Sequence, residues 1–181
     1  MSPNPNLTGT WTIDPAHSRL GFVARHAMVT KVRGSFKDFA GTAVLDAQNV
    51  GDSKVDVSIE VASVDTGNEQ RDGHLRTNDF FDAATYPQIH FATTAVEALD
   101  DDNFQVTGDL TIKDITKPVA VDFEFTGLAT DPYGNQRAGF EGRTVINRKD
   151  WGVNFNAALE TGGVLVSEKI TLEFDISAIK I

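Results

Sequence analysis

The chain has 181 residues, a formal net charge of −10 and no cysteine. Its length fits one domain with a sizeable core, and the missing cysteine excludes disulfides, thiolate catalysis and cysteine metal sites. The negative charge argues against binding to nucleic acid or to anionic membrane surfaces.

The first nine residues contain two prolines, two asparagines and a glycine, and we expect them to form a flexible arm ahead of one domain at 10–181. The N-terminus lacks the basic and apolar regions of a signal peptide, which predicts a cytoplasmic protein. If the natural chain begins earlier, a periplasmic or secreted location stays open. No apolar run approaches the roughly 18–20 residues of a membrane-spanning helix, so no stable membrane insertion is expected.

Alternation of apolar and polar residues dominates the chain after residue 9 and predicts strands with one apolar face. Turn signals rich in Asp, Asn and Gly separate the runs. Many short strands joined by short turns indicate an antiparallel sandwich or barrel of about eight to ten strands. The clearest runs are 19–26, 54–61, 119–126 and 169–176, and weaker ones are 10–14, 31–38, 41–46, 88–98, 103–112 and 138–147.

The stretch 66–86 breaks the alternation and predicts a short helical insert. Thr66 and Glu69 have the spacing of a capping box, and Asp72 can pair with Arg76 one turn further along the helix. A long charged loop on a rigid scaffold is a frequent place for function. The capping and pairing signals favour a structural interpretation, in which the insert is a plug or gate at the rim of the barrel.

An ordered set of short motifs runs nearly the whole length of the chain: WTID at 11–14, HS at 17–18, His26, GSF at 34–36, FAG at 39–41, RDGHLR at 71–76, DFFD at 79–82, YP at 86–87, GDLTI at 108–112, TKPV at 116–119 and INRKDWG at 146–152. In this order they resemble the YceI-like family of lipocalin-like bacterial proteins. The resemblance implies an all-β fold, an antiparallel eight-stranded β-barrel, with the helical insert around residues 67–82. It also implies a polyisoprenoid, isoprenoid quinone or fatty-acid ligand and carries over the expectation of a homodimer.

Two polar residues fall on apolar faces if their strands are unbroken. His26 shares the face of Leu20 and Phe22, and Glu168 shares the face of Phe174. We expect both, with Trp151, near a polar end of the binding site; the alternative is that each lies at a strand end in water or beyond a bulge. The predicted ligand-binding set is Leu20, Phe22, His26, Phe36, Phe80, Phe91, Phe123, Trp151, Glu168 and Phe174.

No catalytic motif stands out: the chain has no G-x-S-x-G, H-E-x-x-H or P-loop sequence. We therefore expect no catalytic residues, no metal and no cofactor. The leading hypothesis is a protein that binds, stores or transports a long apolar ligand inside the barrel. The alternatives are a stress-associated protein-interaction scaffold with a filled barrel, and an enzyme acting on an isoprenoid or quinone through His26 or Glu168.

Overall fold

The computed structural model describes residues 2–159 and 163–181. It contains one α-helix, α1 (Glu69–Leu75), and eleven strands in the described residues. The strands are β1 (Gly9–Ile13), β2 (Arg19–His26), β3 (Thr30–Phe36), β4 (Phe39–Leu45), β5 (Lys54–Glu60), β6 (Val64–Asp65), β7 (Gln88–Ala98), β8 (Asn103–Ile112), β9 (Ile115–Thr130), β10 (Gln136–Asn147) and β11 (Lys169–Lys180). Short 3₁₀ turns lie at η1 (Pro5–Leu7), η2 (Pro15–His17), η3 (Val50–Asp52), η4 (Val61–Ser63) and η5 (Arg148–Trp151).

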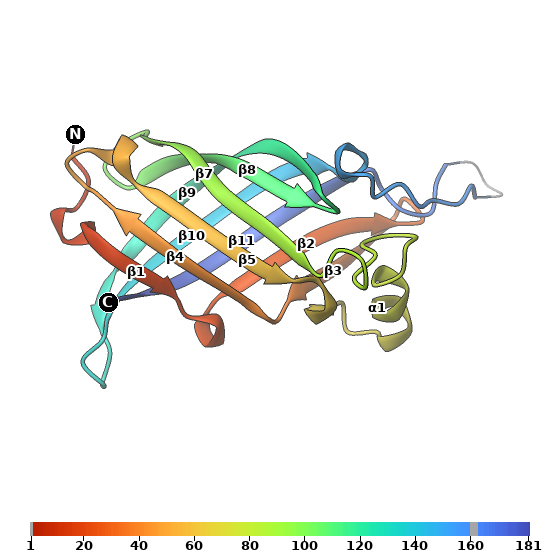
Figure 1. The fold of residues 1–181 in the computed structure, drawn as a ribbon, viewed down its shortest axis with the longest axis horizontal. Coiled ribbons are helices and arrows are strands. Elements are labelled where there is room, and N and C mark those ends of the chain that lie inside the picture. The colour runs from red at the N-terminus through yellow and green to blue at the C-terminus, as the bar shows by residue number, and fades with distance from the viewer. Residues whose placement is uncertain (1, 160–162) are drawn as a thin grey trace.

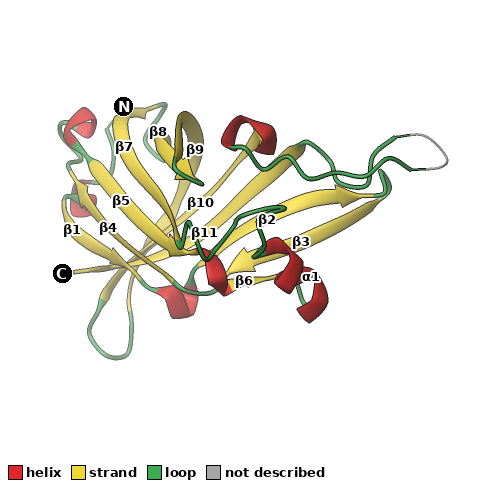
Figure 2. Ribbon diagram, turned by 45° about the vertical axis from the view of Figure 1, so that its right-hand side comes forward, coloured by secondary structure: helices red, strands yellow, loops and turns green. Residues whose placement is uncertain are grey.

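The strands form a closed antiparallel barrel (Figures 1 and 2). β1 and β2 both pair with β11, β3 pairs with β2 while β4 pairs with β1, and β6 pairs with β3 while β5 pairs with β4. The barrel wall thus contains three long strands that are each interrupted by a short break: β1 with β2, β3 with β4, and β5 with β6. Counted in this way, eight strands follow one another in chain order around the barrel, and the pairing of β1 with β11 closes it. The predicted eight-stranded barrel is confirmed.

The two ends of the barrel differ. α1 and the turns that follow it lie at one end, and both chain termini lie towards the other (Figure 1). The residues before β1 contact this second end of the barrel. Leu7 is 4% exposed, and its carbonyl accepts a hydrogen bond of 2.8 Å from Nε1 of Trp11. The arm is held because an apolar side chain in it completes a buried cluster.

The helical insert lies where it was predicted, but its internal contacts differ. Asn68, and not Thr66, caps α1 by accepting a hydrogen bond from the amide of Arg71 at 3.0 Å. Asp72 turns inward, is 4% exposed, and accepts hydrogen bonds from the amide and hydroxyl of Thr66 at 2.8 and 2.5 Å. Arg76 instead donates to the main-chain carbonyls of η4 and β6. The predicted capping box is therefore wrong, because Asn68 is the N-cap. The predicted Asp72–Arg76 pair is also wrong, because Asp72 bonds to Thr66 within the insert while Arg76 bonds to η4 and β6.

Candidate functional site

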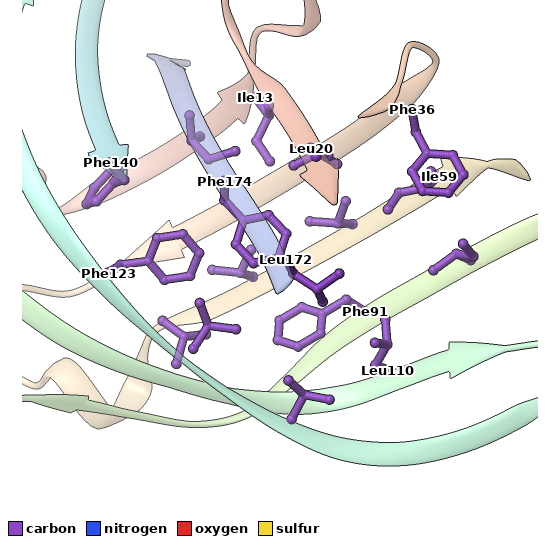
Figure 3. A pocket seen from close by; sticks show the side chains of 18 of the residues that line it. Ile13, Leu20, Phe36, Ile59, Phe91, Leu110, Phe123, Phe140, Leu172 and Phe174 are labelled. Carbon is purple, nitrogen blue, oxygen red and sulfur yellow. The ribbon is translucent and has the colours of Figure 1, made fainter. Parts of the chain in front are cut away.

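An apolar cavity of about 330 Å³ lies inside the barrel. Its wall consists of the inward-facing residues of the strands, and the labelled side chains in Figure 3 point into the space between them. Because side chains alternate between the faces of a strand, the apolar set of each alternating run reaches the cavity together. The runs contribute Leu20, Phe22 and Ala24 from β2, Val55, Val57 and Ile59 from β5, Val119, Val121 and Phe123 from β9, and Ile170, Leu172, Phe174 and Ile176 from β11.

Three cavity phenylalanines lie against glycines of the neighbouring strand. A Cβ atom added to Gly34 would come within 2.4 Å of the ring of Phe22, and one added to Gly142 within 2.6 Å of the ring of Phe123. A Cβ atom added to Gly108 would likewise come within 2.5 Å of the ring of Phe91. The missing side chains let these rings press close to the wall, which leaves the middle of the barrel open. A glycine inside a strand often indicates that a neighbouring group lies close to the backbone. The alternation of apolar and polar residues does not show this feature.

The insert and η5 cover the α1 end of the cavity. Leu75, Phe80 and Phe81 of the insert line it. The ring centroids of His74, Phe80 and Phe155 lie 4.9–5.1 Å apart, so the insert meets the segment after η5 through edge-to-face and tilted aromatic contacts. Trp151 is 3% exposed and lines the cavity from η5. The described contacts support the predicted position of the insert at the barrel rim.

The structure places eight of the ten predicted ligand-binding residues around the cavity: Leu20, Phe22, Phe36, Phe80, Phe91, Phe123, Trp151 and Phe174. Their contact with a ligand stays a prediction. The other two, His26 and Glu168, lie outside it, and both are exposed.

The strand predicted at 19–26 forms, but His26 lies at its end and outside the cavity, whereas the strand predicted at 164–176 begins only at Lys169 and leaves Glu168 out. His26 is the last residue of β2, next to the hairpin turn, and Glu168 comes one residue before β11 begins. Glu168 forms an ion pair of 2.8 Å with Lys149, and the hydrogen bond from Lys149 holds the pKa of this carboxyl below its ordinary value. Both residues match the alternative of a strand end in water.

Arg148 is a charged residue that lines the cavity and was not among the predicted ligand-binding residues. Arg148 is 5% exposed and follows Asn147, the last residue of β10. The inward face of β10 carries Phe140 and Ile146, so even-numbered parity continued by two residues would have marked Arg148. Burial lowers the pKa of its guanidinium, and the negative charge of Glu168 opposes that shift.

Within residues 2–159 and 163–181, no group of three or more His, Asp or Glu side chains is arranged to hold a metal ion. None of the helices in this described part of the chain is both long enough and apolar enough to span a membrane. The geometry of the interior suits a molecule that buries apolar surface, with polar contact concentrated at few positions.

A family model described as the YceI-like domain matches residues 11–178. The chain belongs to the YceI-like family. Among curated relatives of this YceI-like protein, a UPF0312 protein of Photorhabdus laumondii is 42% identical over 161 residues, which covers 88% of this chain and 82% of the relative. A UPF0312 protein of Staphylococcus aureus is 40% identical over 164 residues, 90% of this chain and 93% of the relative.

Solved structures share the barrel. BcnA of Burkholderia cenocepacia is 26% identical, with a TM-score of 0.80 and coverage of 91% of this chain and 98% of BcnA. The YceI protein of Campylobacter jejuni is 31% identical, with a TM-score of 0.75 and coverage of 87% and 90%. A polyisoprenoid-binding domain from Saccharophagus degradans, 17% identical with a TM-score of 0.72 and coverage of 94% and 98%, shares the fold.

Proposed function

We propose that this YceI-like protein binds one long apolar molecule inside its barrel. The observation that carries the proposal is the cavity of about 330 Å³, whose lining is almost entirely aliphatic and aromatic. Its volume falls at the low end of the roughly 300–1,000 Å³ of ligand pockets, which suits a single thin chain. Burial of each methylene group contributes about 0.8 kcal/mol, so affinity grows with chain length.

The ligand class that we propose is a polyisoprenoid, an isoprenoid quinone or a fatty-acid derivative. The description of the Saccharophagus degradans domain as polyisoprenoid-binding supports this class. Apolar contacts are non-directional, so the wall alone would accept chains of several kinds. Storage or transport, rather than catalysis, is the role we propose, with a cytoplasmic location and a homodimer as further expectations.

Organic extraction of the purified protein followed by mass spectrometry tests the proposal. We expect an extractable long-chain lipid in the wild type, and native mass spectrometry should show one copy per chain. A filled barrel with no extractable lipid and no uptake of added palmitic acid or geranylgeraniol would contradict it. That outcome would favour the interaction scaffold.

Phe91→Trp links retention to the cavity, because the larger ring has to move into the open space. Overpacking costs about 1–3 kcal/mol, and 1.4 kcal/mol corresponds to a factor of ten, so retained lipid should fall roughly tenfold. Tyr133→Trp is the matched control, since Tyr133 is 90% exposed on the β9–β10 turn. Equal lipid content in the two variants would count against binding at this site.

A further inference from the structure

The β2–β3 hairpin has a charge opposite to that of the chain as a whole. Residues 19–36 contain four of the 16 basic residues and none of the 26 acidic ones, in a protein with a net charge of −10. Arg19 and Arg33 share Glu173 at 3.9 and 3.8 Å. Arg25 and Lys31 are exposed, and no carboxylate of the described residues lies within 4.0 Å of either cation. The negative net charge therefore does not describe the tip of this hairpin.

Arg25 and Lys31 face each other across the hairpin, close to its turn. They are direct partners in the register of β2 and β3. Like charges in such positions repel each other and destabilise the pairing of the strands. The guanidinium of Arg25 reaches towards the turn, where Nη1 donates a hydrogen bond of 3.2 Å to the carbonyl of Val29. Two adjacent cations that no described carboxylate neutralises suit contact with an anionic surface outside the chain.

The turn between the two cations exposes apolar side chains. Met28 is 60% exposed and Val29 is 75% exposed. Ala27 and Met28 have positive φ angles of 50° and 67°, and the amide of Val29 donates to the carbonyl of His26. A turn with two positive φ angles favours Asn, Asp and Gly, which adopt this conformation with little strain. A strained and apolar sequence at an exposed turn is a conflict with local preference of the kind that is found at functional sites.

The turn protrudes at the α1 end of the barrel. In Figure 2 the β2–β3 hairpin extends past α1 and η5, beside the segment that precedes β11. The amide of Ala27 donates a hydrogen bond of 2.7 Å to the carbonyl of Leu165, and Val164 in the same segment is 38% exposed. A narrow convex tip offers little of the roughly 800 Å² that each partner buries in a stable protein interface. It can enter the headgroup layer of a bilayer, where apolar side chains are buried close to anionic phosphates.

We propose that the hairpin tip, residues 25–31, docks this protein on membranes that contain anionic lipids. Met28 and Val29 enter the headgroup layer, and Arg25 and Lys31 contact lipid phosphates. The attraction of a negative membrane surface for basic groups falls off within about a Debye length, roughly 8 Å at physiological ionic strength. Cations at a protruding tip are therefore attracted, while carboxylates further away are screened. The inference goes beyond the proposed function, because this contact does not depend on what the cavity holds.

Vesicle flotation measures the docking. Wild-type protein is mixed with vesicles of phosphatidylcholine, either alone or with one quarter phosphatidylglycerol, at low and at high NaCl concentration. At low salt we expect a partition coefficient about tenfold higher on the anionic vesicles, because two cations contact their phosphates. High salt should remove the difference. A wild type that binds both kinds of vesicle equally, or neither, overturns the inference while the proposed function stands.

Two double variants with the same change in charge assign the docking to the tip. Arg25→Gln with Lys31→Gln should lower the partition coefficient on anionic vesicles about tenfold. Lys54→Gln with Arg143→Gln removes the same charge from exposed positions in β5 and β10 and should bind like the wild type. Equal losses in the two double variants would show an effect of net charge alone and would overturn the inference.

A third double variant separates docking from folding. Ala27→Asn with Met28→Gly gives the turn residues that its φ angles favour, so the protein should melt at the same or a higher temperature than the wild type. It should bind anionic vesicles about tenfold more weakly, because the side chain of Met28 no longer enters the headgroup layer. Misfolding does not explain a loss in a variant that is equally stable. Undiminished binding by this variant overturns the inference.

The absence of cysteine allows a single introduced thiol to report the contact. Val29→Cys is labelled with a dye whose emission shifts to the blue in apolar surroundings. We expect this shift on anionic vesicles, and none for the same dye on Tyr133→Cys, since Tyr133 is 90% exposed on the β9–β10 turn. Flotation without a shift at residue 29 would mean contact through another face and would overturn the inference. Binding to immobilised polyglutamate but not to vesicles would assign the tip to an acidic protein and overturn it as well.

Discussion

Trp151 donates a hydrogen bond of 2.9 Å from Nε1 to the main-chain carbonyl of Leu110, and this bond joins η5 to β8. Trp11 makes the corresponding bond of 2.8 Å to the carbonyl of Leu7 near the other end of the barrel. The two indoles are 3% and 1% exposed. Each end of the apolar interior is therefore covered by a tryptophan whose polar atom is satisfied by the main chain.

Trp151→Phe should lower the free energy of unfolding by about 1–3 kcal/mol, because it leaves a buried carbonyl without its donor. Urea denaturation followed by circular dichroism measures the change. Trp11→Phe is the matched comparison and should show a loss of similar size. A loss below about 0.5 kcal/mol for Trp151→Phe would mean that water replaces the indole and that this end of the barrel is not dry.

Gly142→Ala should push the ring of Phe123 into the cavity. The added methyl group would lie 2.6 Å from the ring, so we expect a loss of about 1–3 kcal/mol in stability together with weaker uptake of palmitic acid. The double variant Gly142→Ala with Phe123→Leu should recover uptake, since the smaller side chain makes room. Gly73→Ala is the control, because nothing lies within 4 Å of its added Cβ. Normal uptake by Gly142→Ala would show that the ring has space elsewhere.

Asp72→Ala should loosen the insert without unfolding the barrel. It removes the acceptor of two hydrogen bonds from Thr66, at a cost of about 1–3 kcal/mol for the donors left behind. Hydrogen exchange read by mass spectrometry should rise in peptides covering 66–86 and stay unchanged in β8 and β9. Asp79→Ala, which removes an exposed partner of His74, should change exchange much less. A uniform rise over the whole chain would contradict a local effect.

Arg137 should make stability depend on pH through two carboxylates. It donates to Asp14 and to Asp131, each at 2.8 Å, and these hydrogen bonds hold the pKa of both carboxyls below the ordinary value. A carboxyl with a lowered pKa in the folded state contributes stability above its unfolded pKa of about 3.9 and loses it as pH falls through the folded pKa.

Arg137→Met should therefore destabilise the protein most at pH 7, and its difference from the wild type should shrink as pH falls below about 4. Urea denaturation at pH 7, 5 and 3 measures the difference. Arg33→Met is the comparison, because Arg33 is 58% exposed and lies 3.8 Å from Glu173. A difference for Arg137→Met that stays constant from pH 7 to 3 would show that the guanidinium acts through packing alone.

The sequence by itself determined which side chains face the interior. Leu20, Phe22, Phe123 and Phe174 line the cavity because strict alternation puts every second residue of a strand on one face. The same alternation located the strands, and the break at 66–86 located the insert. These features are local consequences of backbone geometry, so a short window of residues contains them.

Only the tertiary structure decided where each face ends and which polar groups reach the cavity. His26 lies outside because it is the last residue of β2, and Glu168 lies outside because β11 begins only after it. The side chain of Arg148 is held by hydrogen bonds to carbonyls of a later segment. The open volume likewise depends on rings that press against glycines of adjacent strands. Contacts between distant segments decide where the faces end and how much volume stays open, and the alternation within a single run does not contain them.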